Sequence, residues 1–182
     1  MIYPIVVYGN PVLKKVALPI GKDYPELQTL ISDMYRTLQK SEGVGLAAPQ
    51  IGLSIRLFII DLSPLADDLP DFKNFKKTFI NPVIEEFSED EETASEGCLS
   101  IPGLSENVRR SVSIRIRYFD ENWVEHVEEY SKFPARAIQH EYDHLEGHVY
   151  TDRISLIRKQ LISKKLVAIS KGKFECAYKT RL

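Results

Sequence analysis

The segment that constrains the fold most is residues 133–145, which the sequence predicts to be a helix with two histidines on one face. Pro134 suits the first turn of a helix, and Gly147 suits the position just beyond its end. His140 and His144 are four residues apart, a spacing that brings the Cβ atoms of helical side chains to about 5–6 Å. Whatever else the chain forms, one face of this helix has to accommodate two imidazoles.

The segments before that helix have the alternation and the turn signals of antiparallel strands. Residues 112–118 alternate apolar and polar side chains, residues 120–122 predict a turn, and residues 123–130 predict the next strand. Residues 56–60 form an apolar run typical of a buried strand. Residues 79–87 predict a further strand, which Pro82 limits to a sheet edge or a bulge.

Helices are predicted at three further places. Asn10 and Pro11 open a short one. A longer one starts near Pro25 and ends before Gly43, and its apolar stripe consists of Leu27, Leu30, Ile31, Met34 and Leu38. Residues 155–169 form the last helix, and residues 62–77 are expected to be a variable loop. Strands flanked by long helices predict an α+β fold with a mostly antiparallel sheet.

Size and charge set the broad class of the protein. A chain of 182 residues suits one domain over residues 1–182, with a C-terminal helix and tail at about 153–182. The net charge of −2 predicts no binding to DNA, and no apolar run approaches the roughly 20 residues that cross a membrane. The first residues do not have the pattern of a signal peptide. With two cysteines only, we expect reduced thiols and a cytoplasmic location.

Residues 140–144 have the pattern His-Glu-x-x-His, in which both imidazoles can bind one metal ion and Glu141 can act as a general base. The alternative is a solvated helix face without a metal. Zinc peptidases with this pattern take a third ligand downstream, but Tyr150 stands where one group has its histidine, and no glutamate lies between Gly147 and Phe174. Cys98 is the best remaining donor, unless it is a small buried side chain. Cys176 is expected to be inert.

Three motifs in order along the chain resemble the signature motifs of peptide deformylases. They are Gly-Val-Gly-Leu-Ala-Ala-Pro-Gln at 43–50, Glu-Gly-Cys-Leu-Ser at 96–100 and Gln-His-Glu-Tyr-Asp-His at 139–144. The resemblance implies an α+β fold in which antiparallel sheets pack around a central metal-binding helix. It also implies a hydrolase that removes the formyl group from formyl-methionine of nascent polypeptides and releases formate.

The resemblance also implies residue roles. Cys98, His140 and His144 match the metal ligands, and Glu141 matches the acid–base catalyst. Three residues complete the implied site: the Gln50 amide and the Leu99 backbone N–H at the oxyanion, and the Gly45 backbone at the substrate. One divalent metal is implied, Fe2+ in the cell, with Zn2+, Ni2+ or Co2+ as replacements.

Residues around these motifs are candidates for the substrate pocket. Residues 43–50 and 97–99 would form its walls, including Gly97. Phe133 and Ala137 share the face of the two histidines, and Val44 and Ala94 could add to the lining; plain core packing is the alternative.

Charged neighbours of the motifs leave alternatives open. Arg136 either forms a charged rim or points to solvent. Glu96 and Arg110 resemble a pair that fixes the cysteine segment, with Arg109 or an exposed surface pair as the alternatives.

The last helix is basic. Residues 153–173 carry no acidic residue and seven cations, namely Arg153, Arg158, Lys159, Lys164, Lys165, Lys171 and Lys173. Ile154, Ile157 and Leu161 form an apolar stripe. One hypothesis is contact with the ribosome through this helix, where the substrate emerges; the other is a solvated helix with an apolar underside.

Two other functions remain open from the sequence. One is a zinc peptidase, which the missing downstream ligand argues against. The other is a non-catalytic module with a structural metal, which would need a fourth protein ligand, and His126 is the nearest candidate.

Overall fold

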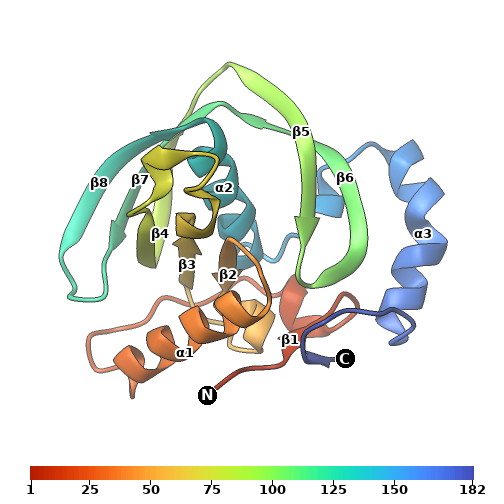
Figure 1. Ribbon diagram of the computed structural model, residues 1–182, viewed down its shortest axis with the longest axis horizontal. Coiled ribbons are helices and arrows are strands. Elements are labelled where there is room, and N and C mark those ends of the chain that lie inside the picture. The colour runs from red at the N-terminus through yellow and green to blue at the C-terminus, as the bar shows by residue number, and fades with distance from the viewer.

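The computed structural model, which describes residues 1–182, places helix α2 (Lys132–Leu145) between a five-stranded sheet and a long hairpin (Figure 1). All pairs in the sheet are antiparallel. Its strands, in spatial order, are β2 (Gly45–Ala47), β3 (Leu57–Asp61), β4 (Lys76–Phe87), β7 (Ser113–Phe119) and β8 (Glu125–Ser131). The hairpin consists of β5 (Glu91–Cys98) and β6 (Ile101–Ser111). The predicted α+β fold with mostly antiparallel sheets is therefore confirmed.

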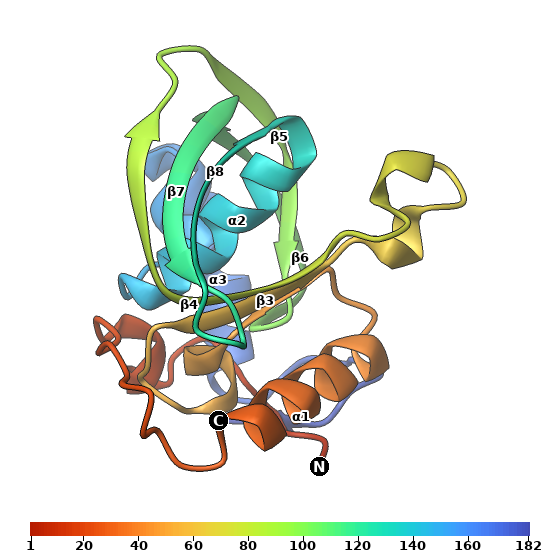
Figure 2. The ribbon, with the colours of Figure 1, turned by 90° about the vertical axis from the view of Figure 1, so that its left-hand side faces the viewer.

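The sheet is covered on both faces near β3. Helix α1 (Leu27–Lys40) packs on one face, where Leu57 and Ile59 join its apolar stripe in one core cluster. On the other face Phe58 and Ile60 join residues of α2 in a second cluster, as Figure 2 shows for the two helices. This double cover explains the continuous apolar run at residues 57–60, because side chains of both orientations are buried.

Strand β4 lies inside the sheet, between β3 and β7, so an edge position for residues 79–87 is wrong. The expected bulge is present instead, because the pairing with β7 shifts register between Ile80 and Val83. Asn81 has a positive φ there, and its side chain bonds both backbone groups of Ile20.

The segment between β3 and β4 extends away from the sheet (Figure 2). It contains short 3-10 turns at Ser63–Leu65 and Pro70–Phe72, and β4 already begins at Lys76. The predicted loop over 62–77 is therefore two residues too long at its end.

The hairpin β5–β6 was not predicted. Its residues are mostly polar and lack a regular alternation, so no strand was predicted around Cys98, which ends strand β5. Other elements that the prediction left out are the pair β1 (Ile5–Val6) and β9 (Thr180–Arg181), and 3-10 turns at Ala48–Ile51 and Tyr150–Asp152. The predicted short helix after Asn10 is present as a 3-10 turn at Pro11–Lys14.

Helix α3 (Leu156–Ser170) is present as predicted, but its buried face is not the predicted one. Ile157 and Leu161 are exposed, at 72% and 67%, and the core contacts come from Ile162, Leu166 and Ile169. The Arg158 guanidinium bonds both carboxylate oxygens of Glu106 on β6, at 2.9 and 2.8 Å. Arg158, Ile162 and Leu166 are spaced four residues apart, so this ion pair turns their face toward the hairpin. No helix of the structure has the length and apolar character that crossing a membrane requires.

Candidate metal centre and catalytic cleft

Strand β5 and helix α2 bring Cys98, His140 and His144 together. One potential ligand atom from each of these residues lies within 4.8 Å of the others. The Cys98 Sγ is 3.4 Å from Nε2 of His144, and the centroids of the two imidazole rings are 5.3 Å apart. A thiolate and two imidazoles form a donor set that suits first-row divalent ions, so these residues fit the implied metal. His126 is not part of this group, because it pairs with Asp120 at 2.9 Å.

The thiol of Cys98 is poised to be a thiolate. Burial raises its pKa, but the charges and hydrogen bonds of His144 and His140 outweigh this effect and lower the pKa to about 5. A deprotonated sulfur is the form that binds a metal.

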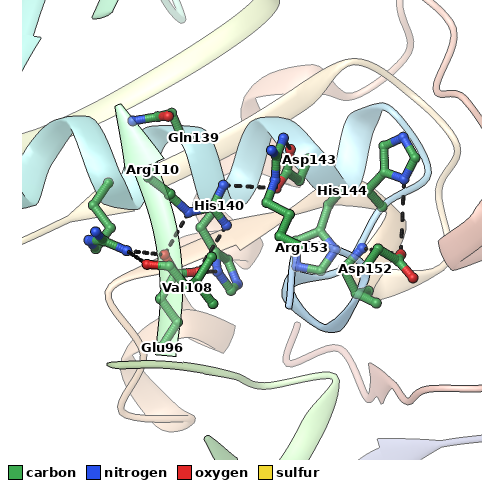
Figure 3. A network of polar contacts seen from close by, with 12 residues as sticks. Glu96, Val108, Arg110, Gln139, His140, Asp143, His144, Asp152 and Arg153 are labelled. Atoms are coloured by element: carbon green, nitrogen blue, oxygen red, sulfur yellow. Dashed lines mark hydrogen bonds and ion pairs between the residues drawn. The ribbon is translucent and has the colours of Figure 1, made fainter. Parts of the chain in front are cut away.

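His140 is oriented by a carboxylate from the neighbouring strand. Its Nδ1 lies 2.9 Å from Oε2 of Glu96, so Nδ1 carries the proton and Nε2 is left as the ligand atom. The Arg110 guanidinium bonds both oxygens of Glu96, at 2.6 and 2.9 Å. It also reaches Asp143, which in turn pairs with Arg153 (Figure 3). The predicted partner of Glu96 is therefore Arg110 and the pair is buried.

The structure decides between the alternatives that the sequence left open for two arginines, Arg136 and Arg109. Arg136 is 8% exposed and donates to Glu96 at 2.8 Å and to the carbonyls of Val108 and Glu92, so pointing to solvent is wrong. Part of its side chain still lines the cleft. Arg109 pairs with Glu91 at the surface, at 2.6 Å, and takes no part in the network.

Glu141 faces the cleft from the same helix. Its Oε2 is buried and has no hydrogen-bond partner in the protein, which is the state of a group that serves a ligand. Burial is the largest cause that raises its pKa, to about 7. A carboxyl with this pKa can both accept and return a proton near neutral pH.

Gly45 leaves the room that Glu141 needs. A Cβ atom at position 45 would lie 2.5 Å from Oε1 of Glu141, closer than real contacts allow. Only glycine lets the β2 backbone come this close to the carboxylate.

The amide of Gln50 has a fixed orientation. Its Oε1 accepts from the backbone N–H of Ala47 at 2.8 Å, which leaves the NH2 group to face the cleft. This Nε2 lies 3.5 Å from the Cys98 sulfur and 3.3 Å from Oγ of Ser100. The 3-10 turn Ala48–Ile51 thus presents an N–H donor beside the metal ligands.

A cavity of about 550 Å³ opens beside these groups. Its lining includes the five residues that sequence reasoning assigned to the pocket, namely Val44, Gly45, Gly97, Phe133 and Ala137. Ala94 is not among the lining residues, so its predicted place in the pocket is wrong. The prediction also missed Ile101 and Leu104 from β6 and Tyr178 from the C-terminal segment. Neither the strand β6 nor Tyr178 is signalled by a pattern in the sequence, because Ile101 and Leu104 are three residues apart and do not follow the two-residue period of a strand.

Comparisons with known proteins agree with this geometry. A family model described as polypeptide deformylase matches residues 2–160. The chain is 52% identical to a peptide deformylase of Christiangramia forsetii, covering 100% of this chain and 96% of the relative. It is 51% identical to one of Cytophaga hutchinsonii, with 100% and 97% covered. The crystal structure of peptide deformylase from Thermus thermophilus superposes with a TM-score of 0.84 at 38% identity, over 94% of this chain and 99% of that chain.

Proposed function

Because the chain belongs to the peptide deformylase family, we propose that the cleft beside Cys98, His140 and His144 is where it removes the formyl group from new polypeptides. This metal-dependent hydrolysis takes place at the N-terminus of nascent chains and releases formate. This site assignment rests on one observation: a cysteine at the end of a strand and two histidines of a helix place ligand atoms within 4.8 Å of one another. Beside them lies a buried carboxylate, one oxygen of which has no hydrogen-bond partner.

We propose that Cys98, His140 and His144 hold one divalent ion, Fe2+ in the cell. A bound ion would supply Lewis acidity at the formyl oxygen and a lowered pKa for water. The thiolate favours a borderline or soft first-row ion over magnesium or calcium, and Zn2+, Ni2+ or Co2+ satisfy the same donors.

Glu141 is the proton carrier in this proposal. It accepts a proton from the attacking water and returns it to the amine that leaves. The raised pKa supports both halves of this exchange, because the carboxylate takes the proton readily and the acid gives it up.

Two donors serve the negative charge that develops on the formyl oxygen. One is the Gln50 amide, whose NH2 group is turned into the cleft by the Ala47 N–H. The other is the backbone N–H of Leu99, which follows the ligand Cys98. A donor in such a site typically contributes about 3–4 kcal/mol to the transition state.

The narrow space around the reacting centre explains why a formyl group would be selected over larger acyl groups. Gly45 and Gly97 bring backbone up to the reacting centre, and a formyl carbon carries only hydrogen, so larger acyl groups would clash. Ala137 and Phe133 offer apolar surface for the methionine side chain, and Phe72 packs 6.2 Å from the Phe133 ring.

The test is to measure metal content and formate release on protein prepared without oxygen, with formyl-Met-Ala and unformylated Met-Ala as substrates. We expect about one metal per chain and formate release from the first peptide alone. Glu141→Ala should keep the metal and lose turnover by at least about a hundredfold. A metal-free Glu141→Ala protein, or cleavage of Met-Ala, contradicts the assignment.

We further propose a cytoplasmic location and a weak ribosome contact through α3. Three of the seven cations of residues 153–173 are engaged within the chain, since Arg153, Arg158 and Lys159 pair with acidic groups. Lys164, Lys165, Lys171 and Lys173 form no ion pair within the chain, and the first two follow the exposed Leu161 by three and four residues on the helix. Co-sedimentation with ribosomes should be lost at high salt and weakened in Lys164→Glu/Lys165→Glu, and binding that is equal in both proteins refutes the contact.

A further inference from the structure

The last segment of the chain, residues 171–182, returns from the end of α3 to β1 (Figure 1). Strand β9 pairs in parallel with β1. The Ile5 N–H donates to the Lys179 carbonyl at 2.9 Å, and the Val7 N–H donates to the Arg181 carbonyl at 3.0 Å. The match to the family model ends at residue 160, before this segment, although the relatives from Christiangramia forsetii and Cytophaga hutchinsonii cover the whole chain.

Tyr178 is the residue of this segment that reaches the cleft. Its ring lines the cavity and packs against the core cluster of α1, and its hydroxyl donates to the Leu99 carbonyl at 2.8 Å. Burial is the largest cause that raises the pKa of Tyr178, so the hydroxyl keeps its proton and remains a donor.

The acceptor belongs to the turn next to the metal ligand. Leu99 and Ser100 form the two-residue turn between β5 and β6, directly after Cys98. The next carbonyl, that of Ser100, accepts from the Tyr8 N–H at 2.8 Å. Two consecutive carbonyls of this turn are therefore held by two chain segments that are themselves paired as β1 and β9.

We propose that Tyr178 is a positioning residue: by holding the Leu99 carbonyl it fixes the conformation of the turn, and with it the direction of the Leu99 N–H that the proposed function places at the formyl oxygen. The proposal rests on the proposed function, because it takes the Leu99 N–H as a donor to the formyl oxygen. Such donors act only within a narrow range of distance, about 2.7–3.1 Å, so a small rotation of the turn is enough to weaken them.

The direct test is Tyr178→Phe in the full, metal-loaded enzyme, because this change removes the hydroxyl and keeps the ring. We expect kcat on formyl-Met-Ala to fall by about threefold to tenfold, the effect of one lost hydrogen bond, with KM within about twofold. The amide NMR signals of Leu99 and Ser100 in the zinc-loaded protein should shift, which is a readout independent of activity.

Tyr35→Phe is the matched control. The Tyr35 hydroxyl is also half-buried and bonds Oγ1 of Thr78 at 3.2 Å, between α1 and β4 and outside the catalytic cleft. A comparable loss of thermal stability is expected from both variants, but Tyr35→Phe should leave kcat and the Leu99 amide signal unchanged.

The outcomes separate cleanly. If the native enzyme releases formate and Tyr178→Phe has the native kcat, the positioning role is refuted while the proposed function stands. A raised KM with unchanged kcat also overturns it, because Tyr178 would then be a binding wall. Equal losses of kcat in both variants would show a general effect of stability. If the native enzyme releases no formate, the proposed function itself fails.

Discussion

Replacing Glu96 with glutamine tests how the proposed metal ligand His140 is held. All four groups that contact this carboxylate are donors: Oε1 accepts from Nε of Arg110 and Nη1 of Arg136, and Oε2 accepts from Nη2 of Arg110 and Nδ1 of His140. Glutamine has one acceptor oxygen, and in either amide orientation its NH2 group faces two N–H donors. At least two hydrogen bonds are therefore lost, and the charge that balances two buried cations disappears.

The size of the effect follows from the pKa of Glu96. Burial alone would raise it, but hydrogen bonds from His140 and Arg110 lower it from 4.5 to about 2. This fall corresponds to about 3 kcal/mol that favours the ionised, folded state at neutral pH. Removing one member of a buried ion pair typically costs a similar 3–5 kcal/mol. We therefore expect Glu96→Gln to lower the free energy of unfolding by about 3 kcal/mol and metal affinity by about 10–100-fold.

The assays are urea unfolding after metal removal and competition for zinc with a chromophoric chelator. Glu91→Gln is the matched control on the same strand, because Glu91 pairs with Arg109 at 2.6 Å but that arginine is 71% exposed. An exposed pair of this kind contributes at most about 1 kcal/mol. If both variants lose the same stability, or if Glu96→Gln binds zinc as the native protein does, the reasoning about this network is wrong.

Two further predictions concern the cleft and the acid stability. In Gly45→Ala the added methyl group would lie 2.5 Å from Oε1 of Glu141, so kcat should fall by at least about tenfold while elemental analysis finds unchanged metal; native turnover would contradict the close approach. For Asp152, burial raises the pKa, but hydrogen bonds from Lys14 and Lys159 outweigh it and lower the pKa to about 2. The stabilisation of the folded state, about 1 kcal/mol after solvent screening, is complete above about pH 5 and is lost as the pH falls through 2. Urea unfolding should therefore find Asp152→Asn less stable than the native protein at pH 6, with most of this difference gone at about pH 2.

The part of the site on α2 could be predicted because its information is local. The helical period alone places His140, His144 and Ala137 on one face, and the structure keeps them there. The strand at 112–118 was found for the same reason, since its alternation reflects one buried face.

The rest depends on contacts between distant segments. The hairpin β5–β6 has mostly polar side chains, and its stability comes from pairing and from buried ion pairs such as Glu96 with Arg110. The rotation of α3 is set by contacts with distant segments, namely the burial of Ile162, Leu166 and Ile169 and the ion pair of Arg158 with Glu106. Cys98 was identified through its motif and not through any pattern of its strand. The division into domains stays a prediction.

The spacing of Glu96 and Cys98 along β5 determines which sequence changes this site can tolerate. Glu96 and Cys98 are two residues apart on a strand, and both side chains reach His140, Glu96 by a hydrogen bond and Cys98 as a candidate metal ligand, although the pairing with β6 shifts register between Gly97 and Cys98. Many substitutions at their neighbours would preserve this arrangement. Inserting or deleting a single residue between them would turn one of the two to the opposite side of the ribbon, so length changes at this point should be far more damaging than replacements.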